Sequence, residues 1–89
     1  MTQLQQIFDH FGIEAQKMKL IEEMAELTVD LAKNKDELKI MAEIADVSVV
    51  LERIVDYYGK EAIENIKQGK IERTLERINS GYYDASQHL

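Results

Sequence analysis

The chain has 89 residues, of which 17 are acidic and 11 basic, so its formal net charge at pH 7 is −6. This charge argues against a general binder of polymeric nucleic acid, and the absence of cysteine excludes disulfides, thiolate metal sites and cysteine nucleophiles. No apolar run is long enough to span a membrane, and the N-terminus lacks a signal-peptide pattern, so we expect a cytoplasmic protein without a membrane segment.

Helices are predicted along the chain, which has no proline and only four glycines. The first runs from Thr2, as N-cap, to His10, and Gly12 stops it. The second spans residues 14–33. An all-α fold is therefore expected.

A third helix is predicted over residues 37–58, capped by Asp36 and stopped by Gly59. Asn34 takes a left-handed turn in the short connection before it, which favours an antiparallel hairpin of the second and third helices. The β-branched residues in 47–50 permit a strand, but the apolar pattern around them continues beyond a strand's length, so a helix is favoured.

The C-terminal part is predicted as a fourth helix over residues 60–79, with an interruption at Gly69. Residues 1–81 are interpreted as one domain. Residues 82–89 form a tail that is ordered only if its tyrosines find a surface.

Three acids cluster on the second helix. Glu22, Glu23 and Glu26 lie within an arc of about 100 degrees, which alone is typical of a solvated face. Apolar residues fill about 200 degrees of the remaining circumference, more than packing on one neighbour requires. Because the chain is also short, this arc predicts a homo-oligomer.

Two further acids interrupt the apolar seam of the third helix. The seam advances by steps of three and four residues, and Glu43 occupies one of its central positions, with Asp46 at its margin. An unpaired carboxylate there should take up a proton or a cation. The seam consists of Ile40, Glu43, Val47, Val50 and Ile54.

The cation at Glu43 has two interpretations. It is a base, namely Lys17, Lys19 or a C-terminal arginine, or it is a metal ion, since one base cannot neutralise five acids. Carboxylate oxygens alone favour Mg2+ over Ca2+ when positions stay open for water and phosphate. Zinc is disfavoured because these segments offer no nitrogen or sulfur ligand. A di-iron site is also disfavoured because it needs histidines beside the glutamates, and His10 and His88 are far from both acidic segments in the sequence.

The pattern Glu22-Glu23-x-x-Glu26, sixteen residues and Glu43-x-x-Asp46 resembles the signature of the MazG-like all-α nucleoside triphosphate pyrophosphohydrolases. That superfamily includes dimeric dUTPases and phosphoribosyl-ATP pyrophosphohydrolase. The resemblance covers residues 14–81, including the basic C-terminal "KIERTLERI". It implies a helical hairpin plus a C-terminal helix in a four-helix-bundle-type domain, completed by assembly into a homodimer or tetramer.

The resemblance also implies an activity. A nucleoside triphosphate is cleaved to monophosphate and pyrophosphate with Mg2+, or Mn2+ as a substitute, a reaction suited to clearing unwanted nucleotides. Glu23, Glu26, Glu43 and Asp46 match the family's metal ligands, and Glu22 matches a neighbour that binds metal or orients the attacking water. All five are the candidate catalytic residues.

Candidate contacts to the phosphates and the base of a nucleotide are basic residues of the C-terminal helix and the tyrosines. Lys70, Arg73 and Arg77 share one helical stripe and are candidates for binding phosphates, although the glutamates alternating with them equally suit a solvated, salt-bridged face. Tyrosines at 57, 58, 82 and 83 suit a base or an apolar interface, so the base preference is left open. The alternative function is a non-catalytic helical oligomer that acts as an interaction or regulatory module.

Overall fold

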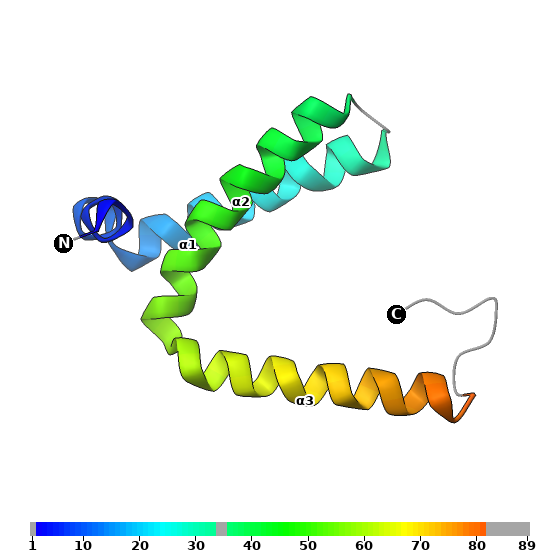
Figure 1. The fold of residues 1–89 in the computed structure, drawn as a ribbon. Coiled ribbons are helices and arrows are strands. Elements are labelled where there is room, and N and C mark those ends of the chain that lie inside the picture. Colours follow the sequence, from blue (N-terminus) through cyan, green and yellow to red (C-terminus); the bar gives the residue numbers. More distant parts are fainter. Residues whose placement is uncertain (1, 34–35, 82–89) are drawn as a thin grey trace. The chain divides into compact units, whose positions relative to one another are not determined.

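The computed structural model describes residues 2–33 and 36–81. These residues form three helices, α1 (Gln3–Ala32), α2 (Glu37–Tyr58) and α3 (Lys60–Asn79) (Figure 1). The all-helical class is confirmed, and residues 47–50 lie inside α2 as expected. Among the described helices none is both long and apolar enough to cross a membrane. The turn expected at Asn34 and the tail over 82–89 lie outside the described residues.

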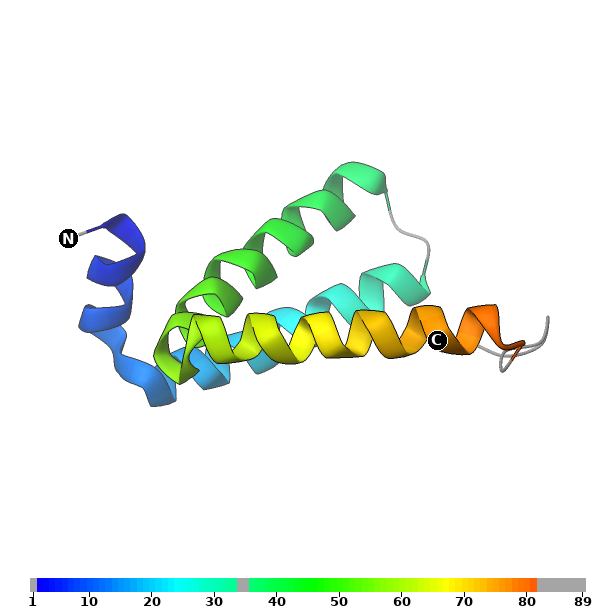
Figure 2. The same cartoon turned by 60° about the horizontal axis from the view of Figure 1, so that its bottom comes forward.

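The chain divides into two compact units, residues 1–58 and residues 59–89. The first unit is a hairpin in which α2 packs along the second half of α1, as the short connection between them predicted (Figures 1 and 2). The second unit contains α3. The candidate metal ligands Glu23, Glu26 and Glu43 all belong to the hairpin.

The start of α1 is fixed by a capping box. The Thr2 hydroxyl accepts a hydrogen bond from the Gln5 backbone N–H at 3.1 Å, and the Gln5 side chain accepts one from the Thr2 N–H at 2.8 Å. These bonds satisfy donors that the first helical turn leaves without partners. The N-cap predicted at Thr2 is confirmed.

A bend at Gly12 divides α1. Gly12 has φ 82 and ψ 168, whereas the helix continues on both sides of it. The predicted break at Gly12 is therefore confirmed, and α1 consists of two helical stretches that meet there. The first stretch continues past the predicted end at His10, and no loop separates it from the second. The part of α1 before Gly12, residues 3–11, is called the N-terminal arm. It turns away from the rest of α1 at the bend (Figures 1 and 2).

The limits of the other two helices follow local signals. The Asp36 carboxylate accepts a hydrogen bond from the Leu38 backbone N–H at 3.0 Å and so caps α2, as predicted. Gly59, with φ 117, separates α2 from α3. The interruption expected at Gly69 is corrected, because α3 runs through it to Asn79. A single glycine costs a helix only about 1 kcal/mol, which the flanking turns can absorb.

The buried centre of the hairpin is unusually polar. On α2, Glu43, Val50 and Ile54 are buried, which confirms the predicted seam. On α1 the buried residues are all polar and lie seven residues apart: Gln16, Glu23 and Asp30 are exposed to 5%, 6% and 5%. Polar groups at such positions cost free energy unless they are partnered, so the seam indicates a site rather than a plain packing surface.

Replacing Gly12 by alanine is expected to destabilise the protein by about 1–3 kcal/mol, because its backbone conformation is one that essentially only glycine adopts. Gly69→Ala is the matched control. Gly69 lies inside α3 with open space around it, so alanine there should stabilise by up to about 1 kcal/mol. Urea unfolding measures both changes. A Gly12→Ala protein as stable as the parent would show that the bend is not maintained in solution.

Candidate metal centre

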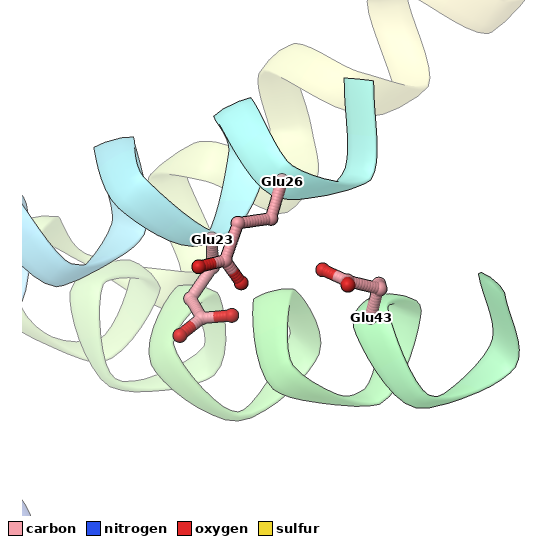
Figure 3. Close-up of side chains that lie close together, drawn as sticks. All are labelled: Glu23, Glu26 and Glu43. Carbon is pink, nitrogen blue, oxygen red and sulfur yellow. The ribbon is translucent and has the colours of Figure 1, made fainter. Parts of the chain in front are cut away.

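Three carboxylates meet where the two arms of the hairpin face each other. Glu23 and Glu26 lie one turn apart on α1, and Glu43 comes from α2 (Figure 3). One oxygen from each lies within 4.8 Å of the others. Oxygens on opposite sides of one Mg2+ lie about 4 Å apart. A small side-chain adjustment would therefore bring all three onto a single ion.

Two of these three carboxylates are buried and incompletely partnered. The Oε2 atoms of Glu23 and Glu43 are buried and have no hydrogen-bond partner in the part of the chain that the structure describes. Burial raises the pKa of Glu43, and the neighbouring Asp30 and Glu26 add to this rise while Lys39 opposes it. Hard oxygen donors held together without partners fit a divalent cation such as Mg2+.

Two lysines offset part of the negative charge of the buried acids. Lys19 Nζ lies 2.9 Å from Glu23 Oε1, and this ion pair raises the pKa of Lys19. Lys39 Nζ lies 3.7 Å from Asp30 Oδ2. Among the described residues of the hairpin no ion pair reaches Glu43 itself, and Lys19 pairs with Glu23 and Lys17 with Glu14. Of the expected bases, neither Lys17 nor Lys19 is therefore the partner of Glu43.

Asp30 is a buried acid that the sequence reasoning missed. It lies beside Glu43, its Oδ2 is buried without a hydrogen bond, and it borders an open pocket of about 540 Å³ together with Glu26, Lys39 and Glu43. The signal that could have revealed it is its spacing. Asp30 follows Glu23 by seven residues, which places both on one side of the helix.

The other predicted residues lie outside this group of three. Glu22 and Asp46 are exposed, although Asp46 borders a second pocket that Glu23 also lines. Lys70, Arg73 and Arg77 belong to α3 in the other unit, so their proposed contact with phosphates stays a prediction.

That second pocket measures about 400 Å³, and its lining comes from α2 and from both sides of the bend at Gly12 in α1. Its apolar lining comes from Ile7, Phe11, Ala15, Val49 and Val50. Gln16, Lys19 and Arg53 add polar groups to the same lining.

Arg53 is held in place on one side of this pocket. Its guanidinium carbon lies 5.1 Å from the centroid of the Phe8 ring, and its Nη1 donates to Asp56 Oδ2 at 3.0 Å. Its buried Nε has no hydrogen-bond partner among the described residues. The pocket thus combines an apolar body with fixed polar groups, as small-molecule sites do.

No protein-family model, curated protein or solved structure matches this chain.

Proposed function

We propose that this protein is a Mg2+-dependent nucleoside triphosphate pyrophosphohydrolase that releases pyrophosphate and a nucleoside monophosphate. The observation that carries the proposal is the group of Glu23, Glu26 and Glu43, whose oxygens converge from two helices and include buried atoms without partners. The pocket beside it shares Glu23 and is large enough for part of a nucleotide. The resemblance of the acid pattern to the MazG-like signature supports the same activity.

In this proposal the acids divide into metal ligands and a residue that acts on the attacking water. Glu23, Glu26 and Glu43 would hold the ion, with Asp46 at the border of the adjacent pocket. Bound Mg2+ supplies a Lewis acid that offsets the charge of the triphosphate. Water attacks the α-phosphorus, the bond from that phosphorus to the bridging oxygen breaks, and pyrophosphate leaves. Exposed Glu22, next to the group, would orient the water and accept its proton.

The test is a panel of ribo- and deoxyribonucleoside triphosphates with Mg2+, in which pyrophosphate and inorganic phosphate are assayed separately. We expect one pyrophosphate for each monophosphate and no activity in chelator. Glu26→Gln should be impaired, whereas Glu14→Gln, an exposed acid of α1 outside the group, should retain the parent's rate. No turnover of any substrate by the parent would favour a non-catalytic oligomer, and release of inorganic phosphate alone would place the cleavage at another bond.

The proposal includes a homodimer or tetramer. Large apolar side chains are exposed on the hairpin, among them Ile21, Met24, Leu38, Met41 and Ile44. On each helix these residues follow one another at steps of three, which places them on one side of that helix, and apolar helix faces of this kind suit an interface. A second copy of the chain is the proposed partner, and light scattering that reports a monomer of 10.3 kDa at micromolar concentration would contradict it.

A further inference from the structure

Gln16 is the most buried neutral polar side chain in the hairpin, and it lines the pocket of about 400 Å³ described above. No hydrogen bond joins its amide to another described residue, and its amide atoms are not among the described side-chain atoms that are buried without a partner. The body of the side chain is therefore buried, while the amide itself is open to the pocket that it lines. A molecule in the pocket can accept a hydrogen bond from this amide and donate one to it.

The chemistry of the lining specifies what kind of molecule fits. An amide presents a donor and an acceptor side by side, which matches the edge of a nitrogen heterocycle better than a carboxylate or an ammonium group does. The apolar lining includes the aromatic ring of Phe11, and aromatic and aliphatic side chains accommodate flat heterocycles. The pocket is therefore suited to a planar body with a hydrogen-bonding edge.

The pocket lies next to the group of three carboxylates. Glu23 belongs both to the pocket lining and to the group of three carboxylates. Gln16 precedes Glu23 by two turns on the same side of α1, so a single nucleotide can reach from one to the other.

We propose that the nucleobase of the substrate binds in this pocket and that the Gln16 amide selects it by hydrogen bonds to the edge of the base. The inference rests on the proposed function, since it names the specificity residue of that same site. It gives Gln16 no part in holding the metal. The variant Gln16→Met, which keeps the length of the side chain and removes its donor and acceptor, therefore separates base selection from metal binding.

The experiment compares kcat/KM for dATP, dCTP, dGTP, dTTP and dUTP in the presence of Mg2+. In Gln16→Met the best substrate should lose about tenfold or more in kcat/KM, mainly through KM, and the preference among bases should narrow. The rise in melting temperature on adding Mg2+ should stay at the parent's value. Gln16→Glu keeps an acceptor but loses the donor, so the order of preference should shift. Gln6→Met, an exposed glutamine of the same helix, is the matched control and should behave as the parent.

The outcomes distinguish the two proposals. If the parent hydrolyses nucleotides but Gln16→Met and Gln16→Glu, shown to be folded by urea unfolding, keep the parent's base preference, the role of Gln16 is overturned and the hydrolase stands. If the parent hydrolyses none, binding of the five deoxynucleoside monophosphates followed by NMR decides the role of the pocket. Base-selective binding that Gln16→Met loses would support it, and equal binding by both proteins would refute it.

Discussion

Replacing Glu43 by glutamine should lower turnover at least about 100-fold, while the metal-free protein stays as stable as the parent or becomes more stable. Glutamine keeps the shape of the side chain and removes one negative charge from a group in which Glu23 and Glu26 provide like charges. Changes to groups that only support metal ligands already cost up to about 100-fold, so the loss of a ligand should cost no less. Turnover in Mg2+ and urea unfolding in chelator measure the two effects separately.

The stability of the metal-free parent protein should depend on pH in a definite direction. Burial raises the pKa of Glu43 in the folded state above its value in the unfolded chain. The folded state then holds its proton more tightly, so stability should increase as pH falls from neutral through the raised pKa, and the gain should be complete at the ordinary pKa of a glutamate. Glu43→Gln cannot titrate and should lack this increase. Stability that follows the same pH profile in both proteins would contradict the assignment.

The control for both measurements is Glu52→Gln, because Glu52 is an exposed acid on the same helix. It removes the same charge from α2 and should change neither turnover nor the pH profile. If Glu43→Gln instead destabilises the fold and retains turnover per folded molecule, then Glu43 is a structural partner of a base, and the catalytic interpretation is wrong.

Helix limits were predictable wherever the signal is local. Thr2 and Asp36 cap their helices through side-chain bonds to N–H groups two or three residues away, and such bonds depend on adjacent residues only. Gly12 and Gly69 show the limit of this reasoning. Both are glycines next to helical sequence, yet only Gly12 adopts a positive φ, and composition alone does not separate the two cases.

The candidate site was predictable in part. The steps of three and four residues between apolar positions of α2 predict that Glu43 lies on the buried seam, and Glu43 is buried there. The carboxylates of Glu23 and Glu26 lie close to it, as predicted. Asp30 was not predicted, because it is not an immediate neighbour of Glu22, Glu23 and Glu26 in the sequence and shares a side of α1 with Glu23 only through a spacing of seven residues. The pocket at Gln16 was not foreseeable from periodicity, because its lining comes from both sides of the bend in α1 and from α2.

Adding Mg2+ or Mn2+ should raise the melting temperature by more than about 10 °C once free metal exceeds its Kd about a hundredfold. Binding only to the folded state contributes about 2.7 kcal/mol at that ratio, and 1 kcal/mol shifts the melting temperature of a small domain by about 4–8 °C. The buried oxygens of Glu23 and Glu43 without partners are the physical source of this gain. Thermal unfolding across a metal titration from chelator measures it, and a constant melting temperature would contradict the metal centre.

The ion pair of Lys19 with Glu23 is expected to limit the metal-induced rise in melting temperature. Its ammonium group lies 2.9 Å from Glu23, and that contact holds it protonated, so it occupies a carboxylate oxygen that a metal ion would also use. Lys19→Gln should therefore lower the melting temperature in chelator, tighten metal binding by about tenfold and enlarge the metal-induced shift. Lys17→Gln removes an equal charge whose partner Glu14 lies outside the group, and it should keep the parent's shift. Equal metal-induced shifts in the two variants would mean that the ion does not bind at Glu23, and the centre would then have to be sought at the pocket bordered by Asp30 and Lys39.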